Sequence, residues 1–335
     1  MEEQLSAAGG ELLARLRAGT ATVTLNRPAA LNALTLGMVE GLARWLDAWE
    51  MDERVQRVVL RGAGEKAFCA GGDIRALHDS VKERTPYAAE FYATEYALDY
   101  RIHTYPKAVV AVMDGIVMGG GMGIAQGARV RIVGDRTRMA MPETGIGAFP
   151  DVGGSYFLSR LDGMLGVYLG LVGPTLNAAD AICCGLADLH VGAPALAASE
   201  LELIRTAIDE HFGRDSVGAI LESLRAEVRP QYTQWTARTL ESLSTRSPTM
   251  LAVTLEQIRR GAAMSLADCF RMELDMIHGC FGHGDYIEGI RALIVDKDRN
   301  PRWHPARAVE VKSSDIEAFF APRWKPTQHP LASLQ

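Results

Sequence analysis

Two glycine clusters constrain the fold of this chain more than any other feature of its sequence. Each lies between a short apolar run and a segment with helical spacing: Gly71 and Gly72 come after 58–60, and Gly119–Gly121 follow 108–113. Short apolar runs before glycine are typical of buried strands, and glycine lets the backbone approach another group closely. Because the order of strand, glycine turn and helix occurs twice, we predict the α/β class.

Hydrophobic periodicity divides the chain into two parts. Strand-like runs occur at 21–26, 58–60, 108–113, 128–134 and 139–141. Helical spacing covers 36–52 and 76–104, the second broken near Pro86, and then 199–212, 216–227, 233–244, 247–262 and 265–280. We therefore predict an α/β core over 1–195 and an all-helical region over 196–335.

Composition and charge exclude several classes of protein. The 335 residues include 35 Lys+Arg against 41 Asp+Glu, so we expect no nucleic-acid partner. The five cysteines form no Cys-x-x-Cys pair and their number is odd, which suits reduced thiols in a cytosolic compartment. The first residues resemble neither a secretory leader nor an Arg-rich presequence, and no run reaches the roughly 18 apolar residues of a membrane span. We predict a cytoplasmic protein with no membrane partner.

The two glycine loops share one chemical possibility. If the strands before them are neighbours, one backbone N–H from each loop converges on a single carbonyl oxygen and forms an oxyanion hole. A phosphate loop is the other interpretation, but the Lys-Ser/Thr that completes one is absent. A purely structural turn is the third.

Two carboxylates lie eight residues apart in a glycine-rich, apolar stretch. Glu143 follows Met141-Pro142, and Asp151 lies in Phe149-Pro-Asp-Val-Gly-Gly. Burial there raises a carboxyl pKa and suits it to base or acid chemistry. Taken alone, each carboxylate is better explained by structure, with Asp151 a helix N-cap. Their position after the two glycine loops favours a catalytic function.

Other mechanisms lack their sequence signatures. There is no Gly-x-Ser-x-Gly elbow to activate Ser155, and the eight histidines show no His-Glu-x-x-His or similar spacing. Cys69 lies beside the first glycine loop without an evident base, so we interpret it as structural. We expect no catalytic metal.

Taken together, four motifs in a set order resemble the crotonase (enoyl-CoA hydratase/isomerase) superfamily. They are Leu31-Asn-Ala-Leu34, Ala67-Phe-Cys-Ala-Gly-Gly-Asp-Ile74, Gly115-Ile-Val-Met-Gly-Gly-Gly121, and Pro142-Glu143 followed by Gly147 and Pro150-Asp-Val-Gly-Gly154. Any one of them is weak evidence, whereas the ordered set is specific. The resemblance covers about 15–195 and implies a core built as a spiral of ββα turns.

The same resemblance implies how an acyl-CoA substrate binds. Backbone N–H groups of Gly72 and Gly120 polarise the thioester carbonyl. The loops implied for substrate binding contain Leu31, Ala33, Ala70, Asp73 and Ile74.

Hydratases of the superfamily use two glutamates, one in the helix after the second glycine loop and one in the Pro-Glu turn. Here the first position is Gly123 and the second is Glu143. The pair of Glu143 and Asp151, and the segment 284–303, are similar to the 3-hydroxyisobutyryl-CoA hydrolase branch. That branch implies hydrolysis of a short 3-hydroxyacyl-CoA, as in valine degradation. It also implies that Glu95, within 87–104, lies near the acyl group.

Several alternatives stay open at this stage. Glu143 either attacks the thioester carbonyl or deprotonates water, and Asp151 either holds the substrate hydroxyl or protonates the leaving thiolate. The rival functions are an enoyl-CoA hydratase or isomerase and a non-catalytic acyl-CoA-binding protein. We expect no cofactor, because CoA is part of the substrate. A trimer-type homo-oligomer is typical of the superfamily, although the helical region can cover the surface through which trimers form.

Overall fold

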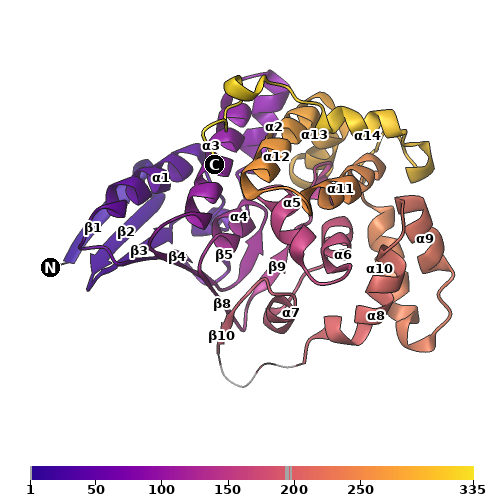
Figure 1. Cartoon of the computed structure of the whole chain (residues 1–335), viewed down its shortest axis with the longest axis horizontal. Helices are drawn as coiled ribbons and strands as arrows, with labels where there is room; N and C mark the ends of the chain where they lie inside the picture. The colour runs from indigo at the N-terminus through magenta and orange to yellow at the C-terminus, as the bar shows by residue number, and fades with distance from the viewer. Residues whose placement is uncertain (1, 193–195, 197) are drawn as a thin grey trace.

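The computed structural model describes residues 2–192, 196 and 198–335, and two sheets lie in its N-terminal part (Figure 1). The larger sheet has seven strands in the order β1-β2-β3-β4-β6-β8-β10. Its strands are β1 (Glu2–Ala7), β2 (Leu12–Arg17), β3 (Thr20–Leu25), β4 (Arg57–Gly62), β6 (Ala108–Met113), β8 (Val130–Gly134) and β10 (Leu189–Val191). The first three strands pair antiparallel, and the others pair parallel.

A second sheet of three short parallel strands continues from the ends of the first. It contains β5 (Ala67–Cys69), β7 (Ile116–Met118) and β9 (Arg138–Ala140) in that order. β4 and β6 are neighbours in the large sheet, and β5 and β7 are neighbours in the small one. This pairing satisfies the condition on which the oxyanion-hole interpretation depends.

Seven helices accompany the sheets in the described residues up to 192. They are α1 (Leu36–Glu50), α2 (Ile74–Glu83), α3 (Tyr87–His103), α4 (Gly120–Gln126), α5 (Gly154–Phe157), α6 (Leu165–Val172) and α7 (Ala178–Cys183). Thr35 caps α1 by accepting a hydrogen bond from the N–H of Met38, and Asp73 caps α2 in the same way through the N–H of Ala76. α3 packs against both α1 and α4, and it crosses the site described below.

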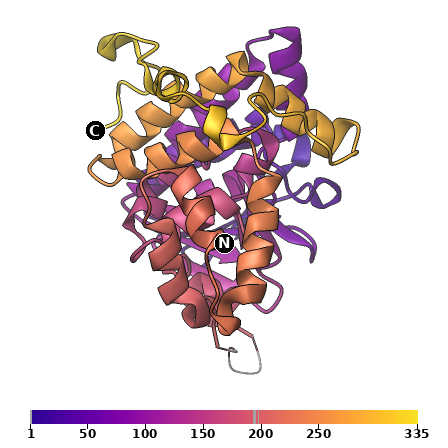
Figure 2. The same cartoon turned by 90° about the vertical axis from the view of Figure 1, so that its right-hand side faces the viewer.

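The described residues after 195 contain helices and no strand, which confirms the all-helical prediction for them. The helices are α8 (Glu200–Phe212), α9 (Val217–Arg225), α10 (Thr233–Ser244), α11 (Pro248–Gly261), α12 (Leu266–Gly282), α13 (Gly284–Ile290) and α14 (Ser313–Phe320). Figure 2 shows several of them side by side in front of the strands. The predicted boundary between 195 and 196 falls at residues 193–195 and 197, which lie outside the described residues.

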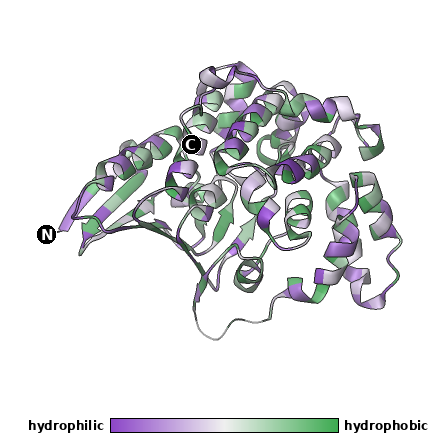
Figure 3. Cartoon of the chain, viewed as in Figure 1, coloured by the Kyte–Doolittle hydropathy of each residue, from purple (hydrophilic) through white to green (hydrophobic). Residues whose placement is uncertain are grey.

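Both parts of the chain contribute to one hydrophobic core. Buried side chains from the sheets, such as Val23 and Ala111, belong to the same cluster as Phe270 and Ile277 on α12. In Figure 3, hydrophobic residues occur on the strands and helices of the N-terminal part and on the helices of the C-terminal part. α12 packs against α3, and α13 packs against α2. The helical region therefore belongs to the same hydrophobic core as the sheets.

The predicted strands and helices are confirmed, but the strands β1, β2, β5, β7 and β10 and the helices α6, α7, α13 and α14 were not predicted. The expected break near Pro86 separates α2 from α3. β1 was not predicted because its sequence, Glu-Glu-Gln-Leu-Ser-Ala, lies at a sheet edge and is mostly exposed. β5, β7 and β10 have only three residues each, too few to show a period. Within the described ranges, no helix is long and apolar enough to cross a membrane.

Candidate active site

One cavity of about 210 Å³ brings together the residues predicted to be catalytic. It lies where the ends of β5, β7 and β9 meet α3, α12 and α13. Of the predicted residues, the cavity is lined by Gly72, Gly120, Glu143, Asp151, Glu95, Ala70 and Ile74. Leu31, Ala33 and Asp73 do not line it.

The two glycine loops face each other at this cavity. A Cβ atom built on Gly71 would lie 3.5 Å from the backbone nitrogen of Gly120, so the loops are in contact. A backbone bridge joins Leu34 to the first loop through the carbonyl of Gly71 and the N–H of Asp73, which leaves the N–H of Gly72 unused. Gly120 is the first residue of α4, and its N–H has no acceptor among the described residues either. Two unused donors therefore line one cavity, as an oxyanion hole requires.

Glu143 begins a short 3₁₀ helix, η3 (Glu143–Ile146), directly after β9 and Pro142. Its side chain is buried, and Oε2 has no hydrogen-bond partner among the described residues. Burial, together with the nearby Asp151, raises the pKa of Glu143 well above its ordinary value, and Arg246 opposes this shift. Glu143 also lies beside the second glycine loop, because a Cβ on Gly119 would approach its Oε1 to 3.4 Å.

Asp151 enters the cavity from the turn before α5. It is buried, and the hydroxyl of Tyr96 on α3 donates a hydrogen bond of 2.7 Å to its Oδ2. Burial raises the pKa of Asp151 to about 6, although the Tyr96 hydrogen bond opposes the shift. The next residue, Val152, has a φ of 52°, an uncommon and strained conformation for a β-branched residue.

The helical region anchors the turn that carries Asp151. The carboxylate of Glu273, on α12, accepts hydrogen bonds from the N–H groups of Gly153 at 2.7 Å and Ser155 at 2.8 Å. Glu273 is fully buried, and burial raises its pKa to about 8 while these hydrogen bonds oppose the shift. On α11, the Nε2 of Gln257 donates to the carbonyl of Pro150 at 2.6 Å. Two distant helices thus hold the backbone on both sides of Asp151.

Sequence reasoning missed Tyr96, Glu273 and Gln257. Glu273 alone left a signal, since it is a charged residue within the apolar spacing of the predicted helix 265–280. Nothing in the sequence indicated that Tyr96 or Gln257 faces the turn at 150–155.

Glu95 and Asp99 occupy successive turns of α3, and neither is paired. Glu95 Oε1 and both oxygens of Asp99 lack a partner among the described residues. Burial raises both pKa values well above the ordinary range, with Asp151 adding to the shift of Glu95 and Glu95 to that of Asp99. Glu95 Oε1 lies so close to Gly120 that a side chain there would clash with it.

Asp99 explains why position 123 is glycine. A Cβ on Gly123 would clash with Asp99 Oδ2 and would lie 2.7 Å from the Cβ of Val152. Asp99 therefore fills the space that a side chain at 123 would need. Among the described residues, neither Asp99 nor Gly123 lines the cavity. Position 123 therefore contributes no carboxyl to the cavity, and the carboxyls that line it are Glu95, Glu143 and Asp151.

The loops expected to bind CoA are tied together by Arg27. Its guanidinium donates to the carbonyl of Ala33 at 2.7 Å and forms an ion pair of 3.0 Å with Asp73. The N–H of Ala70 donates to the carbonyl of Leu31 at 3.1 Å. These contacts join the two loops that contain the five residues predicted to bind CoA. Of the five, Ala70 and Ile74 line the cavity. Arg27 was not identified from the sequence.

Two other candidate nucleophiles are held in structural positions. Burial raises the pKa of Cys69 to about 12, so its thiol stays protonated at neutral pH. The hydroxyl of Ser155 is fully buried and accepts a hydrogen bond of 2.9 Å from Gln257. Both observations agree with the structural interpretation of these side chains.

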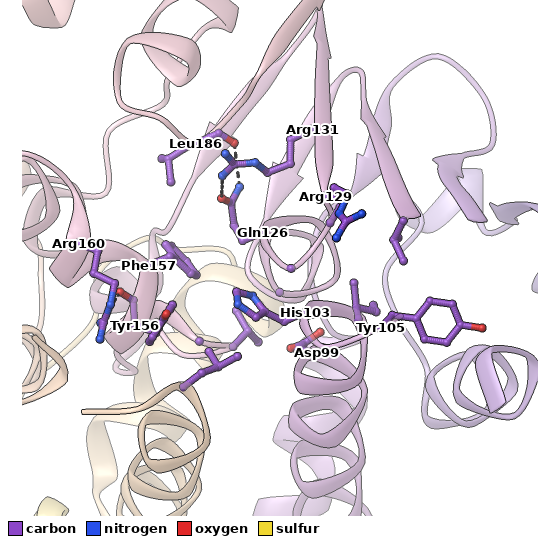
Figure 4. A pocket seen from close by; sticks show the side chains of 18 of the residues that line it. Asp99, His103, Tyr105, Gln126, Arg129, Arg131, Tyr156, Phe157, Arg160 and Leu186 are labelled. Atoms are coloured by element: carbon purple, nitrogen blue, oxygen red, sulfur yellow. Dashed lines mark hydrogen bonds between the residues drawn. The ribbon is translucent and has the colours of Figure 1, made fainter. Parts of the chain in front are cut away.

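A second hollow, of about 450 Å³, shares Val152 with the first cavity as a lining residue, and Figure 4 shows it from close by. Asp99 and His103 on α3 face it, and Gln126 bonds both Arg131 and the carbonyl of Leu186 there. None of the predicted site residues lines this hollow. We therefore assign the chemistry to the smaller cavity.

Sequence comparisons find relatives that cover most of this chain. A family model described as enoyl-CoA hydratase/isomerase matches 20–206 and 192–320. The chain is 37% identical to "3-hydroxyisobutyryl-CoA hydrolase, mitochondrial" of Gallus gallus, covering 93% of this chain and 89% of that protein. It is also 37% identical to "3-hydroxyisobutyryl-CoA hydrolase 1" of Arabidopsis thaliana, covering 94% and 92%.

Solved structures show the same fold under different titles. A carnitinyl-CoA dehydratase from Mycobacterium thermoresistibile is 42% identical, with a TM-score of 0.89 over 93% of this chain and 96% of that one. An enoyl-CoA hydratase from Rhodobacter sphaeroides is 36% identical, with a TM-score of 0.87 over 93% and 98%. The fold, the paired glycine loops and these matches together show that the chain belongs to the crotonase (enoyl-CoA hydratase/isomerase) family.

Proposed function

We propose that this chain hydrolyses the thioester of 3-hydroxyisobutyryl-CoA, or of a similar short 3-hydroxyacyl-CoA, to the free hydroxy acid and CoA. The names of the curated relatives describe this hydrolysis, and we place it in valine degradation. One observation carries the proposal: the buried carboxyl of Glu143 lines one cavity with two unused N–H donors, while position 123 carries no carboxyl because a side chain there would clash with Asp99. The acyl-CoA is the substrate, and the reaction needs no cofactor.

The glycine loops stabilise the charge that develops on the carbonyl oxygen. When a nucleophile adds to the thioester carbon, that oxygen becomes an anion between the N–H groups of Gly72 and Gly120. Loss of one such donor typically raises the barrier by about 3 kcal/mol. Because the donors are backbone groups held in loops between packed strands and helices, they need no reorganisation during the reaction.

Glu143 supplies the reacting carboxylate by one of two routes. In the first, a carboxylate oxygen bonds to the acyl carbon and the C–S bond breaks, giving a mixed anhydride that water then hydrolyses. In the second, Glu143 takes a proton from water while the water oxygen bonds to the acyl carbon. Quenching the reaction with hydroxylamine separates them, because only the anhydride route leaves a hydroxamate on Glu143, seen by peptide mass spectrometry.

Asp151 acts on a different part of the substrate from Glu143. With a pKa of about 6, it holds a proton below neutral pH and accepts hydrogen bonds above it. We assign it to the acyl hydroxyl or to the proton that the leaving thiolate takes up. A CoA thiolate is a good leaving group, so loss of this carboxyl costs less rate than loss of Glu143.

The titles of the solved relatives make hydration the competing function. The resemblance to the hydratases implies a glutamate at position 123, where this chain has glycine, although Glu95 and Asp151 also line the cavity with Glu143. Incubation with crotonyl-CoA and with 3-hydroxyisobutyryl-CoA decides between the two. Our proposal predicts free thiol from the hydroxyacyl thioester and unchanged enoyl absorbance, whereas loss of enoyl absorbance without thiol contradicts it. Tight acyl-CoA binding without either reaction identifies a binding protein.

Location and assembly stay predictions. We propose a cytoplasmic protein, tested by cell fractionation, although several relatives are named mitochondrial. We also propose a homo-oligomer of the trimer type, which light scattering on the purified chain tests. A monomeric mass would contradict the trimer and favour the alternative, in which the helical region covers the surface through which trimers form. The absence of nucleic-acid and metal partners also stays a prediction.

A further inference from the structure

Two tyrosine hydroxyls meet in the wall of the active-site cavity. Tyr92 comes from α3 and Tyr286 from α13, and their hydroxyl oxygens lie 3.1 Å apart. Tyr92 is 5% exposed and Tyr286 is 0% exposed, and both line the cavity. The pair therefore joins the α/β core to the helical region inside the site.

The pair has one hydrogen-bond donor to spare. Each phenol has one O–H, and their mutual hydrogen bond uses only one of the two hydrogens. The described residues offer no second acceptor to the pair, and aromatic rings such as Phe91 and Phe281 surround it. Burying a hydroxyl without a partner is unfavourable, so an oxygen that arrives with a ligand satisfies the spare donor.

The spare donor lines the same cavity as an unpartnered acceptor. Leu293 lines this cavity and is 45% exposed, whereas Tyr92, Tyr286 and Glu95 are almost fully buried. Tyr92 and Glu95 are three residues apart on α3 and share one helix face. Among the described residues, Glu95 Oε1 has no hydrogen-bond partner, and it lies beside Gly120, where a built Cβ would clash with it. The cavity thus offers a spare donor, and also an acceptor that lies next to one of the predicted oxyanion donors.

We propose that Tyr92 and Tyr286 determine acyl specificity by donating a hydrogen bond to an oxygen on the acyl chain, while Glu95 accepts the hydrogen of that same oxygen. This assignment rests on the proposed thioester hydrolysis. A hydroxyl satisfies both groups because it donates and accepts. A 3-oxo group only accepts, and a plain alkyl chain does neither, so both leave a buried polar group unpaired.

The test compares substrates that differ only in the hydroxyl. Release of CoA thiol from 3-hydroxyisobutyryl-CoA and from isobutyryl-CoA is measured for wild type, Tyr92→Phe and Tyr286→Phe. We expect the kcat/KM of wild type to be much higher for the hydroxyacyl thioester than for isobutyryl-CoA. In at least one variant this preference should fall about tenfold, because the variant lacks one neutral hydrogen bond. Activity on isobutyryl-CoA should stay the same or rise, because fewer polar groups are left unpaired.

The matched control is Tyr168→Phe. Tyr168 is a buried tyrosine on α6 whose hydroxyl accepts a hydrogen bond of 3.2 Å from Trp235, outside the cavity. This variant should keep the wild-type preference. An unchanged preference in folded Tyr92→Phe and Tyr286→Phe overturns the assignment.

A binding measurement separates this inference from the proposed function. Calorimetry measures how tightly each of the two thioesters binds to Glu143→Gln. The measurement is then repeated on Glu143→Gln that also carries Tyr92→Phe or Tyr286→Phe. Selective binding of the hydroxyacyl thioester that depends on Tyr92 or Tyr286 supports the specificity assignment even where wild type releases no thiol. Thiol release without such selectivity leaves the proposed function standing and overturns the assignment.

Discussion

Replacing Glu273 should disturb catalysis although its side chain lies outside the cavity lining. Its carboxylate accepts two backbone N–H groups from the turn after Asp151, at 2.7 and 2.8 Å. Glu273→Gln keeps one acceptor oxygen and turns an amide N–H₂ toward the second donor. A buried donor left unpaired costs about 1–3 kcal/mol, which we take as the expected loss in the free energy of unfolding.

The effect on rate follows from the strain in the same turn. Val152 holds a left-handed conformation that costs about 1–3 kcal/mol for such a residue, so the turn relaxes when its anchor weakens. Asp151 precedes Val152 and moves with it. A displacement of about 1 Å at a reacting group lowers the rate by as much as 10²-fold. We expect kcat to fall by about tenfold or more while KM changes little, because the CoA loops belong to other elements.

The assay is urea unfolding followed by fluorescence, together with kcat and KM from thiol release. Glu256→Gln is the matched control, since Glu256 is a half-exposed glutamate on α11 that pairs with Arg260. Pairs of this kind contribute about 0–1 kcal/mol, so the control should behave like wild type. Glu273→Gln with wild-type stability and a kcat within twofold would refute the reasoning.

Three further predictions concern other parts of the site. Gly123→Ala should lower the free energy of unfolding by about 1–3 kcal/mol, because its Cβ meets Asp99 and Val152; calorimetry showing no loss would contradict this. Asp99→Asn should stabilise the fold increasingly as pH rises above about 4, because the raised pKa makes the folded state hold a proton that the unfolded state releases. Urea unfolding at pH 5 and pH 8 with equal differences from wild type would count against it. Arg27→Met should raise KM severalfold with kcat nearly unchanged, because Arg27 ties Asp73 to the other CoA loop; an unchanged KM argues against that role.

Local chemistry made the centre of the site predictable. Gly72, Gly120 and Glu143 lie at the ends of three short parallel strands, and parallel strands bring the segments that follow them to the same edge of a sheet. Apolar runs and glycines indicate such strand ends, but the sequence left open whether the two strands are neighbours, and Gly72 and Gly120 followed from the family resemblance. The two carboxyls gained a catalytic interpretation only from their position after the glycine loops.

The rest of the site depends on contacts between distant parts of the chain. Glu273 is separated from Gly153 by 120 residues, and Tyr286 from Tyr92 by 194. Helical periodicity shows that a side chain is buried, but it does not show against what. Asp99 and Gly123 show the same limit, because the sequence singled out Gly123 but only its contact with Asp99 explains the glycine.

The central claim is that Glu143 acts on a thioester held in the oxyanion hole, and release of CoA from 3-hydroxyisobutyryl-CoA tests it most directly. A thiol-reactive dye follows the reaction for wild type and Glu143→Gln, which keeps size and polarity but cannot act as a base or carboxylate nucleophile. Removing such a group costs about 10²–10⁴-fold in rate, so we predict rapid release by wild type and near-complete loss in the variant. Release by Glu143→Gln within tenfold of wild type, or no release by wild type, would contradict the account.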